Sequence, residues 1–178
     1  MRLENGMLQG RNIRLRLAEV SDAAFIFALR SDEERNRYLS AIGAEVSAQA
    51  EWLAKYKERE KAGTEYYFII EDRAGAPCGT VRIYDYRGDS FSWGSWVIAP
   101  GGPPTAAIET ALLIYEFAFG ALGFQRCHFE VRKGNDRVQA FHERFGARMT
   151  HEDEHTRYFD YSRVGYEAIR GRYAKYLP

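Results

Sequence analysis

The sequence predicts a mixed α/β domain with a largely antiparallel sheet of about seven strands flanked by helices. Apolar segments with a period of two residues alternate with longer segments of helical period, as such a domain requires. Three consecutive strand segments are joined by short turns, which favours antiparallel pairing. Hydrophobic residues make up 46% of the 178 residues, enough for a buried core. No repeat, linker or low-complexity tract divides the chain, so we expect one domain over residues 1–178.

The N-terminal half is expected to form one strand, two helices and a three-stranded meander. Apolar and charged residues alternate from Ile13 to Leu17, which predicts the first strand. Ser21-Asp22 supplies an N-cap for a helix that begins at Ala23. Gly63 ends a second helix. That helix covers residues 47–61, and the meander strands cover residues 66–71, 79–84 and 91–98.

A break rich in proline and glycine, residues 100–104, separates the meander from the C-terminal half. Thr105 and Asn135 are favourable N-caps, and Gly146 is a favourable helix stop. The terminal helix carries an apolar stripe that either closes the monomer or contacts a second subunit in a homodimer. The elements predicted in this half are helices over residues 105–120, 135–145 and 166–176, and strands over residues 124–132, 149–152 and 156–162.

Composition excludes several classes of protein. The 25 basic residues balance 25 acidic ones, which argues against a general nucleic-acid binder. The two cysteines make no disulfide framework, and the N-terminus lacks a signal-peptide pattern, so we expect a cytoplasmic protein. Glu109 and Glu116 interrupt the longest apolar stretch, which makes it a poor membrane span and a good buried helix.

A series of segments in the second half resembles the GNAT superfamily of N-acetyltransferases, in order and in spacing. The segments are Trp93 to Pro100, a break, a helix ending at Ala111 to Tyr115, then Phe129-Glu130-Val131, Asn135, and Phe141 to Ala147. The resemblance covers nearly the whole chain. It implies a single GNAT-like domain with splayed fourth and fifth strands and an extra C-terminal helix. It also implies direct transfer of an acetyl group from acetyl-CoA (coenzyme A) to a primary amine of a small molecule.

Within this superfamily, the N-terminal half looks similar to acetyltransferases of nucleotide-linked amino sugars. The likeness rests on Leu29 to Asp32, Tyr38 to Ser40 and Gln49 to Leu53. The ribosomal-protein N-terminal acetyltransferases come second. Two alternatives therefore stay open: a protein N-terminal acetyltransferase, and a non-catalytic binding module on the same scaffold.

The resemblance implies how the cofactor is held. Val97 and Ile98 would bind the pantetheine arm through their main chain, although both also fit an ordinary core strand. The diphosphate would lie on N–H groups at a helix start. The candidate donors are Gly101, Gly102, Thr105, Ala106 and Ala107.

The phosphate loop departs from the family pattern. The usual Arg and two glycines are replaced by Pro104, Ala107 and Glu109, and the pair Pro103-Pro104 lacks N–H groups. Glu109 would repel a diphosphate unless it turns away. This departure motivates the non-catalytic alternative.

A second helix start is expected to add contacts to the cofactor. The family places an Asn that touches the cofactor where this chain has Asn135. Arg132, Lys133 and Arg137 surround it and are either phosphate ligands or a solvated basic patch.

The proton donor is predicted to be His142. The family commonly places a Tyr seven residues after the Asn, near the thioester sulfur, and His142 occupies that position at the edge of an apolar stripe. The alternative is a histidine with a structural hydrogen bond.

The general base is not identified by the sequence. Ser92 occupies the place of the usual Glu, Asp85 and Glu130 are candidates, and a water chain is a further alternative. We interpret His128 and Glu130 as structural residues.

Substrate contacts are expected from the first two helices, their loop and the turn between the third and fourth strands. A nucleotide-linked sugar would need cations for its phosphates and aromatic rings for its base or sugar. We predict Arg30, Arg37, Tyr38, Tyr84, Tyr86 and Trp96. The segment from His151 to His155 is interpreted as a solvated acidic turn, so no metal is expected.

Overall fold

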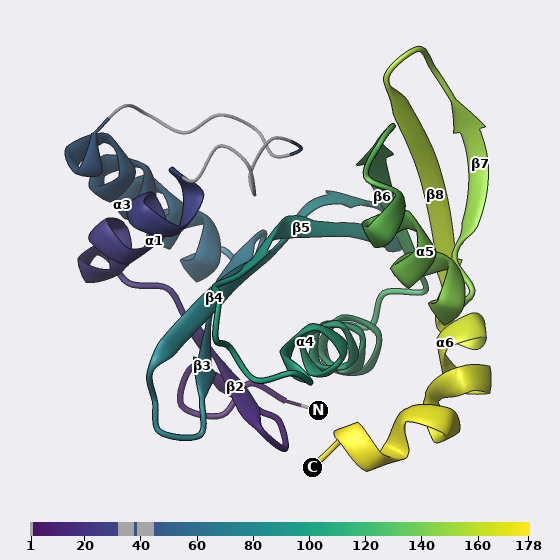
Figure 1. Cartoon of the computed structure of the whole chain (residues 1–178), viewed down its shortest axis with the longest axis horizontal. Coiled ribbons are helices and arrows are strands. Elements are labelled where there is room, and N and C mark those ends of the chain that lie inside the picture. The colour runs from purple at the N-terminus through teal and green to yellow at the C-terminus, as the bar shows by residue number, and fades with distance from the viewer. Residues whose placement is uncertain (1, 32–37, 39–44) are drawn as a thin grey trace.

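A computed structural model describes residues 2–31, 38 and 45–178 and contains one mixed sheet of eight strands (Figure 1). The strand order is β1-β2-β3-β4-β5-β6-β8-β7. Neighbouring strands are antiparallel except β5 and β6, which are parallel. The predicted fold class is confirmed. The strand β1 (Met7–Gln9) was not expected, because its three residues are too few for a period of two to be recognised.

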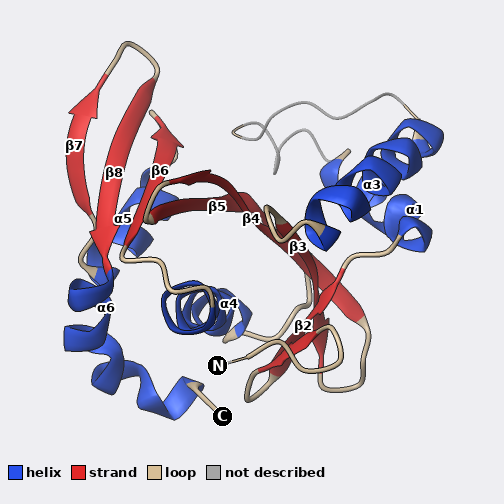
Figure 2. Ribbon diagram, turned by 180° about the vertical axis from the view of Figure 1, so that it is seen from behind, coloured by secondary structure: helices blue, strands red, loops and turns tan. Residues whose placement is uncertain are grey.

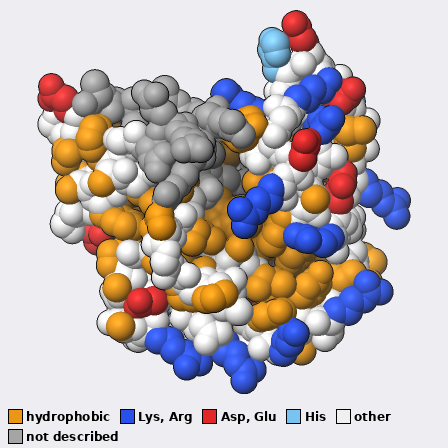
Figure 3. Space-filling model, in the orientation of Figure 1, with side chains coloured by type: hydrophobic (Ala, Val, Ile, Leu, Met, Phe, Trp, Pro, Cys, Tyr) orange, Lys and Arg blue, Asp and Glu red, His pale blue; other side chains and the backbone are white. Residues whose placement is uncertain are grey.

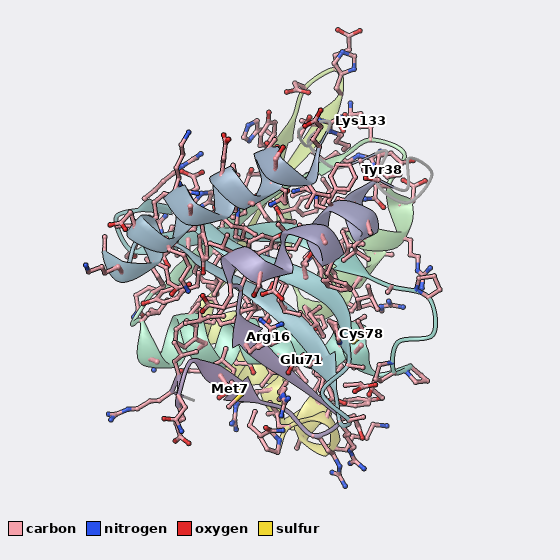
Figure 4. All side chains as sticks on the ribbon, turned by 90° about the vertical axis from the view of Figure 1, so that its left-hand side faces the viewer. Met7, Arg16, Tyr38, Glu71, Cys78 and Lys133 are labelled. Atoms are coloured by element: carbon pink, nitrogen blue, oxygen red, sulfur yellow. The ribbon has the colours of Figure 1, made fainter. Side chains whose placement is uncertain are left out.

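The N-terminal elements lie close to their predicted positions. They are β2 (Ile13–Leu17), η1 (Val20–Asp22), α1 (Ala23–Arg30), α3 (Val46–Lys61), β3 (Tyr66–Asp72), β4 (Pro77–Arg87) and β5 (Ser90–Ile98). The capping prediction at Asp22 was wrong in its chemistry. The Asp22 carboxylate makes no cap bond to α1. It accepts instead from the Arg16 guanidinium at 2.7 and 2.8 Å, and Arg16 also donates to Glu71 at 2.7 Å, which ties β2 to β3 (Figure 4).

The C-terminal elements follow the predicted order. They are α4 (Ala106–Tyr115), the π-helical segment η2 (Glu116–Ala121), β6 (Arg126–Arg132), α5 (Asp136–Phe145), β7 (Arg148–Glu152), β8 (Thr156–Ser162), α6 (Arg163–Arg170) and η3 (Gly171–Tyr176). The terminal helix begins earlier than predicted because the Ser162 hydroxyl accepts from the Gly165 N–H at 3.0 Å and caps it. Gly146 ends α5 in the left-handed region, as expected.

Two apolar clusters cover opposite faces of the sheet. On one face α1 and α3 pack on β3, with Ile26, Leu53 and Ile69 buried among them. On the other face α4 lies between the sheet and the terminal helix (Figure 2). Tyr173 of η3 stacks on Phe145 at 4.9 Å between ring centroids. The terminal helix therefore packs on its own chain. No helix in the described ranges combines the length and the apolar character that a bilayer span needs.

The sheet divides between β5 and β6. These strands pair only at Ser90–Arg126 and Phe91–Cys127 and diverge beyond that point, as the predicted splay requires. A β-bulge in β5 contributes to the divergence, because the register with β4 shifts near Ser95, which has a φ of 48°. Beyond β6, the β7–β8 hairpin projects from the body of the molecule (Figure 1). Its surface carries acidic and basic side chains in mixture (Figure 3).

Candidate active site

A cleft of 340 Å³ lies at the fork between β5 and β6. Strands β4, β5 and β6 and helix α5 supply its walls, and Tyr38 closes one side. Of the predicted site residues, the fork brings together Tyr38, Tyr84, Trp96, Asn135 and His142. Because β6 no longer pairs with β5 at this point, the edge of β5 that faces β6 has no strand partner in the described part of the chain. A ligand chain placed in the cleft can therefore bond to exposed main-chain groups.

The bulged part of β5 forms one wall. The Ser95 carbonyl accepts from the Thr80 hydroxyl at 2.9 Å, which holds the bulge. Val97 pairs with Thr80 and Ile98 with Gly79, so both predicted binding residues are paired on the β4 side of the strand. The indole Nε1 of Trp96 is buried and has no partner among the described residues. A buried donor without a protein partner at a cleft wall leaves one hydrogen bond to be made by water or by a ligand.

His142 belongs to α5, the helix that forms another wall of the cleft. Its side chain is buried, with the ring 4.2 Å from that of Phe129 and 5.3 Å from that of Trp93. Burial lowers the pKa of the imidazole to about 3, because a charged ring would be poorly solvated there. The ring is therefore neutral at physiological pH. Its Nδ1 has no partner in the described part of the chain.

Glu109, the predicted obstacle to phosphate binding, faces the interior. The carboxylate is fully buried. It accepts from the Asn12 N–H at 2.7 Å, from Asn12 Nδ2 at 2.6 Å and from the Thr105 hydroxyl at 2.6 Å. The carboxylate thus joins the first turn of α4 to the residue before β2. It is directed into the interior, toward Asn12 and Thr105, rather than toward the loop surface.

The loop before α4 offers fewer free donors than the sequence suggested. The Gly102 and Ala106 N–H groups already donate within the loop, to Ala99 and Pro103 carbonyls at 3.3 and 2.9 Å. The N–H groups of Gly101, Thr105 and Ala107 have no backbone acceptor among the described residues. Thr105 begins α4 as predicted, but its side chain binds Glu109 rather than capping the helix. Three free amides and the helix dipole suit an anion.

The start of α5 is also open. Asn135 is the N-cap residue by position, yet its side chain makes no cap bond and it lines the cleft. Arg132 lines the cleft as well. Lys133 is paired with Glu152 at 3.3 Å, and Arg137 is exposed and lies outside the cleft lining. Of the three basic residues predicted around Asn135, Arg132 therefore lines the cleft, whereas Lys133 and Arg137 do not.

The side of the sheet that α1 and α3 cover carries the other predicted contacts. Tyr38 donates to the Gly134 carbonyl at 2.8 Å, beside Lys133 (Figure 4). Tyr84 lines the cleft, with the Arg82 guanidinium 4.3 Å from its ring centroid. Arg82 was not predicted, although it precedes Tyr84 by two residues on the same strand, a spacing that places both side chains on one face of the sheet. Arg30 lies on α1 outside the cleft lining, and Arg37 lies outside the described residues.

Tyr86, predicted to contact the substrate, lies outside the residues that line the cleft. Its ring packs on Phe124 at 4.7 Å, on the core side of the sheet. The reason is a bulge in β4 between Tyr84 and Arg87, which breaks the alternation that would have placed both tyrosines on one face. No group of three His, Cys, Asp or Glu within the described ranges is arranged to hold a metal ion.

The candidate bases lie beside the cleft. Glu130 lines it and is exposed. Asp85 is bound by Arg87 at 2.6 Å, and this hydrogen bond is the main cause that lowers the pKa of its carboxyl, with a smaller contribution from His128. Ser92 lies on β5, opposite Tyr84.

Comparisons with known proteins agree with this architecture. A family model described as an acetyltransferase (GNAT) domain matches residues 12–148. The structure described as apo FdhC, a nucleotide-linked sugar GNAT, is 42% identical in sequence. The match covers 98% of this chain and 100% of that chain, with a TM-score of 0.90. No curated protein matches the chain significantly in sequence.

Two more distant structures show the fold alone. A GCN5-related N-acetyltransferase from Brucella melitensis is 22% identical, covering 98% of this chain and 86% of that chain, with a TM-score of 0.79. A spermidine N-acetyltransferase from Vibrio cholerae, in complex with CoA and spermine, is 19% identical. It covers 88% of this chain and 98% of that chain, with a TM-score of 0.73. The chain belongs to the GNAT family of acetyltransferases.

Proposed function

We propose that the protein transfers an acetyl group from acetyl-CoA to the primary amine of a small molecule, and that this molecule is a nucleotide-linked amino sugar. The observation that carries the proposal is the fork between β5 and β6, whose walls hold the buried Trp96 Nε1 and His142 Nδ1, both without a hydrogen-bond partner among the described residues. The 42% identity to a nucleotide-linked sugar GNAT over the full chain supports the substrate class.

The residues present fit a coenzyme A thioester. Three free amides, of Gly101, Thr105 and Ala107, would hold the diphosphate at the start of α4. The unpaired edge of β5 at Val97 and Ile98 would hold the pantetheine arm. Asn135 would add a contact from α5. When bound, the thioester supplies an activated acyl group, so no nucleophilic side chain is needed.

The chain's own residues would orient and polarise the reacting groups. The buried Trp96 Nε1–H would donate a hydrogen bond to an acyl or pantetheine oxygen. His142, neutral at physiological pH, donates a hydrogen bond through one ring nitrogen rather than acting as an imidazolium acid. We therefore replace the predicted role of His142, proton donor to the sulfur, with that of a neutral side chain that donates a hydrogen bond near the sulfur.

The acceptor side of the cleft suits an anionic, aromatic ligand. The Arg82 guanidinium, which also pairs with Glu65 at 3.5 Å, lies 4.3 Å from the Tyr84 ring, and both Arg82 and Tyr84 line the cleft, so a cation and an aromatic ring stand together there. Arg132 adds a second cation at the same cleft. Diphosphate and nucleobase need those two kinds of group.

Neither alternative is favoured by a specific observation. Ribosomal-protein acetyltransferases share only 14% identity with this chain, as in the Vibrio fischeri structure, so they support the fold alone. The non-catalytic alternative rested on the Pro103-Pro104 pair and on Glu109. The Glu109 carboxylate is buried and bonded to Asn12 and Thr105, and beside the two prolines the N–H groups of Gly101, Thr105 and Ala107 keep no backbone acceptor among the described residues.

Two measurements test the proposal. Acetyl-CoA at 100 times its dissociation constant should stabilise the fold by about 2.7 kcal/mol, which thermal unfolding detects. Thiol release should then be measured with amino-sugar nucleotides, free amino sugars, polyamines and peptide N-termini. No thermal shift at millimolar acetyl-CoA would contradict the proposal, and release with peptides alone would replace its substrate class.

A further inference from the structure

Arg82 presents a guanidinium to the acceptor side of the cleft. Its neighbours Val81 and Ile83 on β4 are buried in the apolar cluster that contains α4, so Arg82 and Tyr84 project from the other face of the sheet. Both line the cleft. On β5 the residue paired with Arg82 is Gly94, which has no side chain to cover the guanidinium. The guanidinium is therefore open to the cleft on its β5 side.

Two aromatic rings restrict the plane of this guanidinium. Its central carbon lies 4.3 Å from the centroid of the Tyr84 ring and 5.4 Å from that of the Trp52 ring on α3. Trp52 packs edge-on against Tyr67 of β3, with centroids 5.7 Å apart, and Tyr67 is the residue paired with Arg82 on that strand. A guanidinium beside aromatic faces gains cation–π attraction and loses rotational freedom.

A buried carboxylate faces the Nε edge of the same guanidinium. Glu65, just before β3, is 7% exposed, and its Oε1 lies 3.5 Å from Arg82 Nε. Its other oxygen accepts from Arg59 Nε at 2.5 Å. One carboxylate thus faces two guanidinium groups, so one positive charge stays uncompensated. Because Arg59 makes the closer contact, the charge of Arg82 is the less neutralised of the two.

The outer end of the guanidinium is free to bind a ligand. No residue in the described ranges accepts a hydrogen bond from the terminal nitrogens of Arg82. Its Nε is buried, whereas the side chain keeps 22% of its surface exposed. Two neighbouring terminal nitrogens match two oxygens of a phosphate group in a bidentate contact.

We propose that Arg82 binds a phosphate group of the acceptor through both terminal nitrogens and thereby makes the enzyme select a nucleotide-linked amino sugar over the free sugar. Glu65 is the positioning residue that sets the direction of the guanidinium. The inference rests on the proposed function and deepens it, because it assigns the choice of substrate to one side chain and to a carboxylate outside the cleft.

The physical basis of the selection is the half-buried charge. An acceptor without a phosphate would cover the guanidinium and leave its terminal N–H groups without a charged partner. Sites built around a polar group discriminate strongly against a ligand that lacks the complementary group, because the buried group is then left unpaired.

Arg132 is the competing phosphate ligand. It also lines the cleft, but it is exposed, and no ion pair, hydrogen bond or ring contact in the described part of the chain orients it. It lies three residues before Asn135, which the proposed function assigns to the cofactor. The phosphates of coenzyme A are therefore the second source of the same ligand chemistry, and the test must separate the two sources.

The test compares Arg82→Gln with the matched control Arg59→Gln. Both guanidinium groups face Glu65 and lie near the Trp52 ring, at 5.4 and 5.1 Å, but only Arg82 lines the cleft. Each variant leaves Glu65 one arginine partner, so we expect both to fold. Thermal unfolding of each variant with and without acetyl-CoA checks the fold and the affinity for the cofactor.

We expect Arg82→Gln to lower kcat/KM for a nucleotide-linked amino sugar about 30-fold. Its kcat/KM for the same sugar without the nucleotide, and its affinity for acetyl-CoA, should stay within about twofold of wild type. Arg59→Gln should leave all three quantities within about twofold. Arg82→Lys keeps the charge but not the paired nitrogens, so it should recover only part of the loss.

A binding measurement gives the same comparison without turnover. Uridine diphosphate and thymidine diphosphate are the probes, titrated into the wild-type enzyme and the two glutamine variants in a calorimeter. We expect the wild-type enzyme to bind at least one of them and Arg82→Gln to bind it about tenfold more weakly or worse. Arg59→Gln should match the wild-type enzyme.

Glu65→Gln tests the positioning role, because the two roles open to this carboxylate predict opposite signs. The variant keeps the shape of the side chain and removes its charge. If Glu65 only neutralised Arg82, the KM for the nucleotide-linked acceptor would fall. If it directs the guanidinium, that KM should rise about fivefold with kcat unchanged, and Glu65→Asp should recover part of the loss.

Four results would overturn the inference. The first is a wild-type preference for the nucleotide-linked acceptor in Arg82→Gln, and the second is a loss confined to acetyl-CoA affinity, which would give Arg82 to the phosphates of the cofactor. The third is an equal loss in Arg59→Gln, and the fourth is a wild-type enzyme that binds neither diphosphate. A KM that is unchanged or lower in Glu65→Gln would remove its positioning role. Failure of the wild-type enzyme to acetylate any nucleotide-linked amino sugar would instead remove the proposed substrate class, before any variant is compared.

Discussion

The buried Glu109 carboxylate should be a large contributor to stability. Replacing it by Ala leaves three donors without their acceptor: the Asn12 N–H, Asn12 Nδ2 and the Thr105 hydroxyl. Each buried donor left without a partner costs about 1–3 kcal/mol. Asn12 and Thr105 are only half-buried, so water partly compensates. We therefore expect Glu109→Ala to lower the free energy of unfolding by about 3–5 kcal/mol.

Urea unfolding followed by circular dichroism measures this change, and thermal unfolding should show a fall in Tm of about 2–4 °C for each kcal/mol lost. Glu109→Gln keeps one acceptor oxygen but turns an NH₂ group toward a donor, so we expect an intermediate loss of about 2 kcal/mol. Glu143 on α5 is exposed, and Glu143→Ala serves as the matched control with a change within about 0.5 kcal/mol. A Glu109→Ala loss below about 1 kcal/mol would refute the role assigned to this carboxylate.

The remaining predictions concern the cleft. His142→Phe should lower turnover at least about tenfold and leave acetyl-CoA affinity nearly intact. Steady-state kinetics and a binding titration measure these two quantities, and unchanged turnover would mean that the ring only packs. Because burial lowers the pKa of His142 to about 3 in the folded chain, against an unfolded value near 6.5, the unfolded state binds the extra proton between these values. Stability from this residue is therefore full above about pH 6.5 and falls toward pH 3 by roughly 1 kcal/mol per pH unit; His142→Phe should flatten that slope in urea unfolding at several pH values. Gly94→Ala would place a Cβ 2.9 Å from the Tyr84 hydroxyl, so it should displace Tyr84 and raise KM for the acceptor more than KM for acetyl-CoA; equal effects on both would argue against Tyr84 in the acceptor site.

The sequence determined the elements and their order because each carries its own periodic pattern and its own stop. The alternation from Ile13 to Leu17, the Asn135 start and the Gly146 end of α5 all predicted the observed elements. The resemblance then predicted the fork and, from their spacing along the chain, Asn135 and His142, which both line it.

Only the tertiary structure decided where side chains at irregular positions point. The β-bulge in β4 between Tyr84 and Arg87 breaks the period of two, which is why Tyr86 packs on the core side of the sheet and Asp85 lies beside His128. From the sequence, Glu109 was expected to repel a bound diphosphate. Its hydrogen-bond partner Asn12 could not be foreseen, because Asn12 is distant in sequence and meets Glu109 only in the folded chain. Sequence patterns report which face of an element is apolar, whereas contacts between distant segments and the burial that lowers the pKa of His142 depend on the assembled chain.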